Sequence, residues 1–402
     1  MPTTLPLKGI KVLDLSKVLA GPWSTMTLGD LGAEIWKVEH PVRGDDTRAW
    51  TPPSKNGVST YYMCANRNKQ SLAVDMKTEA GQKIIRDLAR KADIIVENFL
   101  PGSLKRMGLS YDDIKEINPN IVYCTISGYG MTGPEAGRPG YDFVLQAESG
   151  FMAITGQLDG PPTRLGVAFI DLVTGQNATQ AILAALINRD RFGEGAHLDI
   201  ALYDSALHLL ANVASGYLNT GVDAKRYGNA HPTVVPYQLF DTKNGQIALA
   251  VGNDKQFKSM CLNVLKDEKL AADERFISNH NRSLNRLDLA EILATAFLGW
   301  ETESLLDALN KAAVPVGQVR SVGEAFRAPT VAARNTVISS PHPDIGDIQT
   351  VRSPIRFAGD DTPEYTAPPM VGEHTQAILS TVLNMDTAEI ETLNASGAIK
   401  VK

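Results

Sequence analysis

The first half of the chain alternates short apolar segments with segments of helical spacing, and this alternation constrains the fold more than any other feature. We predict strands at 10–15, 34–38, 71–75, 94–97, 121–127 and 197–202, and helices at 23–31, 79–91 and 172–188, with a further helix through Tyr217. Strands that alternate with helices form a parallel sheet covered by helices. The sequence therefore predicts an α/β fold with a parallel-sheet large domain.

The chain is long enough for two domains, since single cores stop growing well below its 402 residues. Residues 218–236 are rich in Gly, Asn, Pro and His, which is typical of a linker or functional loop. Residues 237–326 carry one clear strand, at 246–251, and several helical patterns. From Thr336 the chain carries proline-punctuated strands and a last helix that begins near Gly372. We therefore predict a large domain from 1–217 and 331–402, and a smaller α+β domain within 218–330.

Composition narrows the function classes. The net charge of −6 argues against nucleic acid as a partner, which normally meets a basic surface. Three dispersed cysteines form neither a disulfide framework nor a zinc pattern and suit a reducing compartment. The start of the sequence lacks the features of a signal peptide, and no apolar run is long enough to span a membrane. We expect a cytoplasmic protein that binds no membrane, or a mitochondrial one if a targeting segment has been removed.

A dinucleotide site is the first alternative that such a fold raises. The turn after the first strand, LSKVLAGPWSTMTLGDLG, contains no G-x-G-x-x-G, and Gly21-Pro22 instead leads into the first helical positions. Glu39, after the second strand, is the one residue that mimics the acidic ribose ligand. Walker, HExxH and G-x-S-x-G motifs are also missing. The sequence therefore predicts no metal and no serine-hydrolase mechanism.

Several stretches together resemble one family. They are GIKVLDLSKVLAGPWSTMTLGDLGAEIWKVEHP, NRNKQSLAVDMKTEAG, IIVENFLPGSLKRMGL, SGYGMTGPEAGRPGYDFVLQAESGFMAITG, LGVAFIDLVTGQ and PPMVGEHTQAILS. In this order they are similar to the class III CoA-transferases, the group of formyl-CoA and carnitine CoA-transferases. YGNAHPTVVPYQLFDTKNG and VGNDKQFKSMC most resemble the branch that uses succinyl-CoA with a dicarboxylate such as glutarate.

This resemblance implies an interlocked homodimer, in which each chain has a Rossmann-like large domain built from both chain ends and a small domain between them. It also implies covalent catalysis: an aspartate attacks an acyl-CoA, forms a mixed anhydride and then holds CoA as an aspartyl thioester. The partners are an acyl-CoA and a carboxylic acid. CoA is a substrate, and no metal or redox cofactor is expected.

Asp171 is the candidate nucleophile. It lies between the apolar run 165–170 and the helix predicted to begin at Leu172, where an aspartate is often a helix cap. The family pattern places its catalytic aspartate at this position. A helix N-terminus favours an ionised carboxylate, which nucleophilic attack requires. Gly21, Gly150 and Gly156 are candidates for backbone N–H groups that stabilise the oxyanion, although each is also an ordinary turn glycine.

Tyr141 separates two activities within the superfamily. The related α-methylacyl-CoA racemases have a histidine where the Tyr141-Asp142 pair matches, because inverting a carbon centre needs two acid–base groups. Tyrosine, with a pKa near 10, is a poor proton carrier at neutral pH. CoA transfer is therefore favoured over racemisation, while Tyr141 as a structural tyrosine remains open.

An acidic protein needs clustered cations to hold the phosphates of CoA. The cations at strand ends and loops of the large domain are Lys37, His40, Arg43, Arg48, Arg67, Lys69 and Arg106. The residues expected to bind CoA, mostly by match to family positions, are Val18, His40, Arg67, Val74, Asn98, Phe99 and Arg106. His40 replaces the arginine of the formyl-CoA enzyme, so Arg67 is a second candidate for its role.

The acid pocket is predicted from departures from the formyl-CoA pattern. Leu19 replaces a glutamine that contacts a small acyl group, and the glycine-rich flap of those enzymes is missing. A longer dicarboxylate is therefore favoured over oxalate or formate. Its distal carboxylate needs a cation, for which Lys17, Lys225, Arg226 and His231 are candidates. Arg226 is preferred to Lys225 because its planar fork grips a carboxylate with two hydrogen bonds, whereas His231 is equally an ordinary loop histidine.

Two rival functions remain. The chain is alternatively an acyl-CoA racemase or isomerase, or a non-catalytic CoA-binding protein that kept the fold. The tyrosine at 141 argues against the first, and the intact Asp171 argues against the second.

Overall fold

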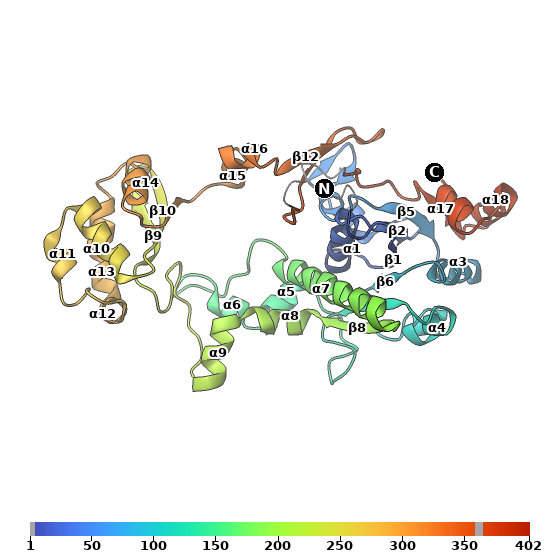
Figure 1. The fold of residues 1–402 in the computed structure, drawn as a ribbon, viewed down its shortest axis with the longest axis horizontal. Coiled ribbons are helices and arrows are strands. Elements are labelled where there is room, and N and C mark those ends of the chain that lie inside the picture. Colours follow the sequence, from blue (N-terminus) through green and yellow to red (C-terminus); the bar gives the residue numbers. More distant parts are fainter. Residues whose placement is uncertain (1–4, 358–364) are drawn as a thin grey trace. The chain divides into compact units, whose positions relative to one another are not determined.

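The computed structural model of the chain describes residues 5–357 and 365–402. The chain divides into two compact units. The first contains the residues through Ser149, Leu165–Gly221 and Arg334–Lys402, and the second contains Gly150–Arg164 and Val222–Ala333. Figure 1 shows the course of the chain through the elements of each unit.

A mostly parallel sheet forms the centre of the first unit. Within the described residues its seven strands are β1 (Lys11–Asp14), β2 (Glu34–Glu39), β5 (Gln70–Val74), β6 (Ile94–Glu97), β7 (Val122–Ser127), β8 (Ala196–Ala201) and β14 (Ile399–Lys400). Their order is β14-β5-β2-β1-β6-β7-β8, and only β14 pairs antiparallel. The six parallel strands thus have the 3-2-1-4-5-6 order of a doubly wound fold, which confirms the predicted α/β class.

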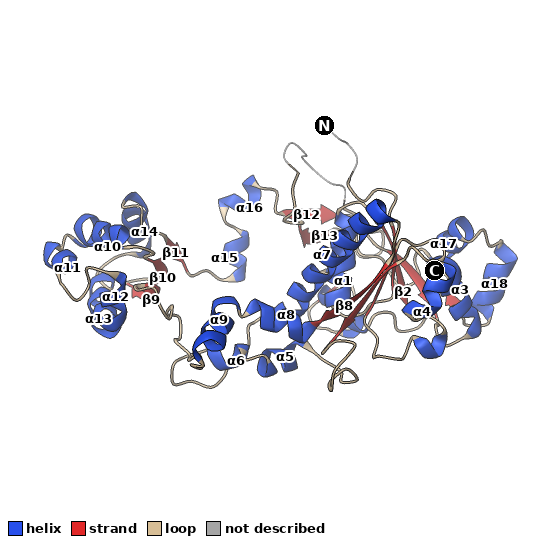
Figure 2. Cartoon of the chain, turned by 60° about the horizontal axis from the view of Figure 1, so that its bottom comes forward, coloured by secondary structure: helices blue, strands red, loops and turns tan. Residues whose placement is uncertain are grey.

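Helices cover both faces of this sheet (Figure 2). The helices and helical turns of the first unit are α1 (Ala20–Asp30), η1 (Asp46–Ala49), α2 (Thr60–Met63), α3 (Glu79–Ala89), η2 (Lys105–Met107), α4 (Tyr111–Ile117), α5 (Asp142–Glu148), α7 (Phe169–Phe192), α8 (Leu202–Leu209), α9 (Ala211–Thr220), α17 (Thr375–Val382) and α18 (Thr387–Ala395). Two short hairpins, β3 (Ser54–Lys55) with β4 (Val58–Ser59) and β12 (Val337–Ser340) with β13 (Ile348–Val351), complete the unit.

One face of the sheet is apolar. Leu13, Trp36 and Leu72 lie on neighbouring strands and are fully buried. They pack in one cluster with side chains of α3, α4, α17 and α18, which lie together on that side in Figure 2. Successive residues of a strand point to opposite faces, so the residues next to Leu13, Trp36 and Leu72 along their strands face the other side of the sheet, which α1 and α7 cover.

The opposite face carries a buried polar row. Asp14, Lys37 and Ser71 are register partners on β1, β2 and β5, and all three side chains are inaccessible to solvent. Lys69 adds a second buried ammonium, 3.1 Å from Asp14. Buried charges persist only when they are paired and hydrogen-bonded. This face therefore combines specific polar contacts under α1 with apolar packing of residues such as Val12 and Ile35.

The second unit contains a three-stranded antiparallel sheet, β11-β10-β9, packed against helices. Its elements are α6 (Phe151–Ile154), β9 (Tyr237–Thr242), β10 (Gly245–Ala250), α10 (Asp254–Ser259), the π-helix η3 (Met260–Leu265), α11 (Glu268–Ala272), α12 (Asn279–Leu284), α13 (Arg286–Phe297), α14 (Thr302–Lys311), β11 (Val316–Gln318), α15 (Val322–Phe326) and α16 (Pro329–Ala333). Ile247, Phe257 and Leu293 are among the buried residues of its own core.

Three features differ from the sequence-based expectation. The segment 150–164 belongs to the second unit, although it was placed in the large domain. The second unit has strands β9 and β11 beside the one strand that was predicted. The helix near Gly372 is not the last, because α18 and β14 follow it and β14 returns to the edge of the large sheet.

Candidate active site

A cavity of about 290 Å³ opens in the first unit where the strand order reverses, between β1 and β6. Open α/β sheets bind their ligands at this switch point, outside the carboxyl ends of the strands. The lining comes from the loops after β1 and β6, the end of β7, the segment before α5 and the first turn of α7. The lining residues are Lys17, Val18, Leu19, Ala20, Asp46, Asn98, Phe99, Leu100, Pro101, Ile126, Ser127, Gly128, Arg138, Pro139, Gly140, Tyr141, Asp171 and Leu202. We call this cavity the switch-point pocket.

Close packing between α1 and α7 brings Asp171 into this pocket. Gly175 lies one turn after Asp171, and a Cβ added there would meet the Ala20 carbonyl oxygen at 2.6 Å. Gly21 approaches the loop after β1 as closely, because a Cβ there would lie 2.3 Å from that of Ser16. Residues four apart share one helix face. The two glycines therefore set Asp171 beside the N-terminus of α1.

Asp171 lies in the first turn of α7 but does not cap the helix. The N-cap residue is Ala168, and Asp142 of α5 accepts hydrogen bonds from the Ile170 and Asp171 amides at 2.8 and 3.4 Å. Burial, and second the negative charge of Asp142, raise the pKa of Asp171 to about 7. The expectation that the helix end would favour the ionised form is therefore not met, because these two effects outweigh the helix dipole.

Tyr61 lines a separate cavity, but Asp171 affects it electrostatically, which sequence reasoning missed. Burial, and next the negative charge of Asp171, raise the pKa of its phenol to about 12. Its ring lies edge-on to Trp50, with ring centroids 4.8 Å apart. Within the described parts of the chain, no group donates a hydrogen bond to the Asp171 carboxylate. Tyr61 thus adds a neutral hydroxyl to the electrostatic surroundings of Asp171, from a segment with no recognisable motif.

Asn98 holds the backbone of the loop after β1. Its side chain accepts from the Lys17 amide at 2.9 Å and donates to the Lys17 carbonyl at 2.8 Å. Both polar groups of the Lys17 backbone are thus satisfied by one amide side chain. The Val18 amide donates to Asp45, whereas the amides of Leu19 and Ala20, which line the pocket, have no acceptor among the described residues. They are N–H donors at the start of α1, available to a ligand.

A second cavity of about 240 Å³ shares Lys17 and Phe99 with the switch-point pocket. It brings together four predicted CoA residues, and its lining includes His40, Arg43, Val74, Phe99 and Arg106. The Lys17 ammonium lies 5.4 Å from the centre of the Phe99 ring, at the junction of the two cavities. We call this cavity the basic pocket. Its position places cations beside the switch-point pocket that Asp171 lines.

Four other predicted cations are used inside the fold. Arg67 donates to Asp30 and, at 2.9 Å, to the Val351 carbonyl, and the structure brings it to neither pocket. Lys37, Arg48 and Lys69 pair with Asp45, Glu39 and Asp14, respectively. Their positions at strand ends suggested ligand binding, but the polar face under α1 uses them instead.

The predicted acid ligands separate into two groups. Lys17 and Leu19 line the switch-point pocket, as does Tyr141, which is 63% exposed. Arg226 and His231 lie in the second unit. All three guanidinium nitrogens of Arg226 donate to carbonyls, those of Gln157, Ala153 and Gly160.

His231 also has a role in its own loop. Its Nδ1 accepts from the Thr233 and Val234 amides at 3.1 and 3.0 Å. Arg226 and His231 therefore organise backbone of the second unit. The glycines Gly150 and Gly156 lie in that unit too, whereas Gly21 lies at the start of α1.

The described residues contain no group of three or more His, Cys, Asp or Glu side chains placed to hold a metal ion. In the same part of the chain, no helix has both the length and the apolar character to cross a membrane.

Comparison with known proteins gives consistent matches. The model of CoA-transferase family III matches residues 7–375. The mouse succinyl-CoA:glutarate CoA-transferase is 44% identical over 98% of this chain and 90% of its own length. The succinate–glutarate CoA-transferase of Agrobacterium fabrum is 42% identical over 96% of each chain. Among solved structures, a CAIB/BAIF family protein from Brucella suis has a TM-score of 0.85 at 41% identity, covering 94% of this chain and 100% of that one.

Proposed function

The chain belongs to CoA-transferase family III, and from this premise we propose that it transfers coenzyme A from succinyl-CoA to a dicarboxylate such as glutarate. Relatives at 42–44% identity carry these substrates in their names. One observation carries the proposal to this chain's own residues: Asp171 lines the switch-point pocket, which shares Lys17 and Phe99 with the neighbouring basic pocket.

The chemistry proceeds through Asp171 in two exchanges. A carboxylate oxygen of Asp171 attacks the thioester carbonyl, the C–S bond breaks, and a mixed anhydride forms as the CoA thiolate leaves. The thiolate then attacks the Asp171 carbonyl carbon, which releases succinate and leaves CoA as an aspartyl thioester. The acceptor carboxylate reverses both steps and regenerates the Asp171 carboxylate. No proton or electron is gained overall, so the scheme needs no metal or redox cofactor.

The pocket supplies what each step demands. Every tetrahedral intermediate carries an oxyanion, and the Leu19 and Ala20 amides at the start of α1 are fixed donors without an acceptor among the described residues. Donors that are already oriented stabilise such charge without reorganisation. A buried carboxylate whose pKa is near 7 is also more basic than an ordinary aspartate, which favours attack once it is ionised.

The two cavities divide the substrate between them. The phosphates and adenine of CoA suit the basic pocket, where Arg43 and Arg106 supply positive charge. The acyl group suits the switch-point pocket, where Leu19 offers an apolar side chain and Lys17 an ammonium for a distal carboxylate. Arg226 is the weaker candidate for that carboxylate, because its guanidinium is already shared among three carbonyls.

We also propose that the working form is a homodimer. The family resemblance implies it, and exposed apolar faces in each unit support it. No residue of α9 is buried, although Tyr217 and Leu218 are 54% and 78% exposed. In the second unit, α15 exposes 76% of Val322 and likewise buries no residue. Light scattering coupled to size-exclusion chromatography should give twice the chain mass, and a monomer at working concentration would contradict the proposal.

The deciding experiment offers succinyl-CoA with a panel of acids: glutarate, itaconate, 3-hydroxy-3-methylglutarate, malate and oxalate. The new CoA esters are separated by chromatography. We expect glutaryl-CoA among the best products, with oxalate a poor acceptor. If no acid accepts CoA, the donor assignment fails.

The nucleophile is tested separately. After incubation with succinyl-CoA alone, mass spectrometry should find CoA on the peptide that contains Asp171. Asp171→Ala should bind succinyl-CoA but neither form the adduct nor turn over, and retained turnover would refute the assignment. Deuterium uptake from solvent at the acyl α-carbon, without CoA exchange, would instead identify an isomerase.

A further inference from the structure

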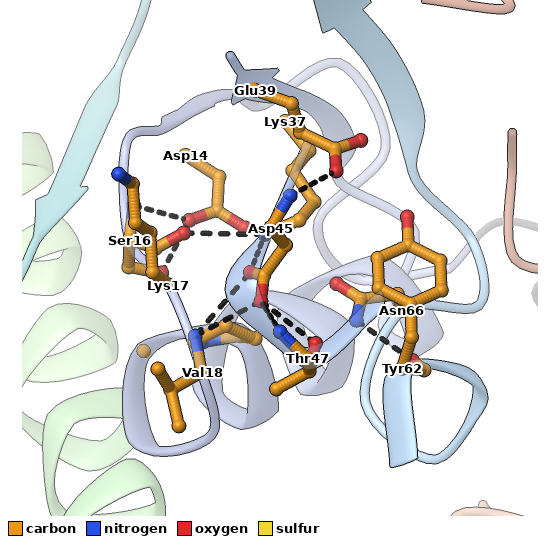
Figure 3. Close-up of polar contacts among 12 residues, drawn as sticks. Asp14, Ser16, Lys17, Val18, Lys37, Glu39, Asp45, Thr47, Tyr62 and Asn66 are labelled. Atoms are coloured by element: carbon orange, nitrogen blue, oxygen red, sulfur yellow. Dashed lines mark hydrogen bonds and ion pairs between the residues drawn. The ribbon is translucent and has the colours of Figure 1, made fainter. Parts of the chain in front are cut away.

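The turn after β1 is fixed by side chains alone (Figure 3). Asp14 accepts from the Ser16 amide at 3.0 Å, and the Lys37 ammonium donates to the Ser16 carbonyl at 3.2 Å. Asn98 holds both polar groups of the Lys17 backbone. Asp45 then accepts from the Val18 amide at 3.3 Å. Every backbone polar group from the Ser16 amide to the Val18 amide is therefore satisfied, and the first amides without an acceptor among the described residues are those of Leu19 and Ala20.

Val18 adopts a conformation that its side chain disfavours. Its φ is 70°, in the left-handed region that β-branched residues rarely enter. Residues held in such conformations persist only when their surroundings over-determine them, and they cluster at active sites. In this turn the contact made to the Val18 backbone is the Asp45 carboxylate. This contact, together with the Asn98 hydrogen bond to the Lys17 carbonyl of the same peptide unit, opposes relaxation of Val18 to an extended conformation.

Asp45 is built into the fold rather than into the pocket. It is 1% exposed, and it also accepts from the Lys37 ammonium at 3.0 Å and from the Thr47 amide and hydroxyl at 2.9 and 2.7 Å. The neighbouring Asp46, but not Asp45, belongs to the pocket lining. Lys37 comes from the polar row on the sheet and joins Asp45 to that row. Figure 3 shows Asp45 between Lys37 and the Val18 backbone.

We propose that Asp45, held by Lys37, is a positioning residue that keeps Val18 in its left-handed conformation and thereby aims the Leu19 and Ala20 amides into the switch-point pocket. This inference rests on the proposed function, because it gives those amides the oxyanion of the Asp171 reaction. Asp45 touches no substrate. Its effect therefore falls on the rate of the chemical steps more than on the binding of acyl-CoA.

The test combines Asp45→Asn with Val18→Gly. Asn keeps the shape of the side chain but replaces a charged acceptor with a neutral one. We expect Asp45→Asn to lower kcat about 10- to 100-fold, since small misplacements of catalytic groups cost this much, with KM for succinyl-CoA changed by less than about threefold. Glycine enters the left-handed region freely, so the double variant should recover about tenfold of the lost kcat relative to Asp45→Asn.

This recovery separates positioning from a merely structural role. A protein that only lost stability at Asp45 would keep the native kcat in its folded fraction, so glycine would have no lost kcat to recover. Asp30→Asn is the matched control, because Asp30 is also buried and paired with an arginine but contacts no residue of the turn. Its folded fraction should keep the native kcat.

Two results overturn the inference: native kcat in folded Asp45→Asn, or an equal loss in the Val18→Gly background. Val18→Pro covers the case in which Asp45→Asn fails to fold, since proline fixes φ near −65° and removes the amide. It should lower kcat about 100-fold or more in a folded protein, and native turnover there also overturns the inference. CoA trapped on Asp171 of the native chain would show that the proposed function stands even when the inference fails.

Discussion

Replacing Asp142 with asparagine should shift the pH dependence of the reaction without destroying the site. Asp142 raises the pKa of Asp171 through like charge, and it also accepts from the first amides of α7. Asparagine removes the charge and keeps an oxygen for the Ile170 amide. The acid limb of kcat/KM for succinyl-CoA should therefore move to lower pH while the folded structure is retained.

The size of the shift follows from the order of the two causes. The pKa of Asp171 rises from 3.8 to about 7, and burial contributes more to this rise than Asp142 does. Removing Asp142 should thus remove less than half of the rise, which leaves the new inflection between about 5.5 and 7. At pH 6 the ionised fraction of Asp171, and with it kcat/KM, should increase up to about eightfold.

The assay is the initial rate at low succinyl-CoA and saturating glutarate, from pH 5 to 8.5, for the native chain and Asp142→Asn. Ionisations of the substrates are common to both proteins, so they cancel in the difference. Circular dichroism at each pH confirms that both remain folded. An unmoved inflection would show that Asp142 does not influence Asp171, and an inflection near 4 would show that burial contributes nothing.

Two further predictions concern stability and binding. The folded chain binds a proton at Asp171 more tightly than the unfolded chain, so the stability of the fold decreases as pH rises from 3.8 to about 7. Asp171→Asn should remove this cost and stabilise the protein by at most about 4 kcal/mol. In thermal melts the gain should be larger at pH 8 than at pH 5, and an equal gain at both pH values would contradict the prediction. Arg106→Ala should raise KM for succinyl-CoA about tenfold with little change in kcat. The control is Arg90→Ala, which breaks an exposed ion pair with Asp87 of α3 and should change neither constant. Equal KM values for the two variants in steady-state assays would show that the basic pocket does not bind CoA.

The parallel sheet was predictable because its strands are buried on both faces and appear as short apolar runs. The strand at 94–97 was predicted with its observed bounds. Prediction failed for segments whose structure depends on packing against distant parts of the chain rather than on their own sequence pattern. The segment 150–164, with its glycines and prolines, has no periodicity that assigns it to either unit, and β9 alternates exposed and buried positions in a small antiparallel sheet.

The site was predictable where residues follow strand ends. Lys17, Val18, Leu19, Asn98 and Phe99 lie in the loops after β1 and β6. Parallel strands bring these loops to one edge, and the family motifs added Asp171 and Tyr141.

Asp45 and the influence of Asp142 on Asp171 were not predictable, because each depends on a contact between segments that are distant in the sequence. The sequence also could not tell which cations line a pocket and which form ion pairs inside the fold. Arg106 and Arg67 both follow the polar pattern of a phosphate ligand, yet only the fold shows that Asp30 occupies Arg67.

The tethers of the turn after β1 also bear on the order in which the protein is assembled. Asn98 follows Lys17 by 81 positions, and Asp45 follows Val18 by 27. During synthesis, the turn therefore leaves the ribosome long before the side chains that shape it, and no local contact substitutes for them. An N-terminal fragment that ends before β6 lacks the Asn98 clamp. The proposed oxyanion donors, the Leu19 and Ala20 amides, are thus positioned only when β1, β2 and β6 have joined. A partly folded chain contains these residues but does not yet hold them beside Asp171.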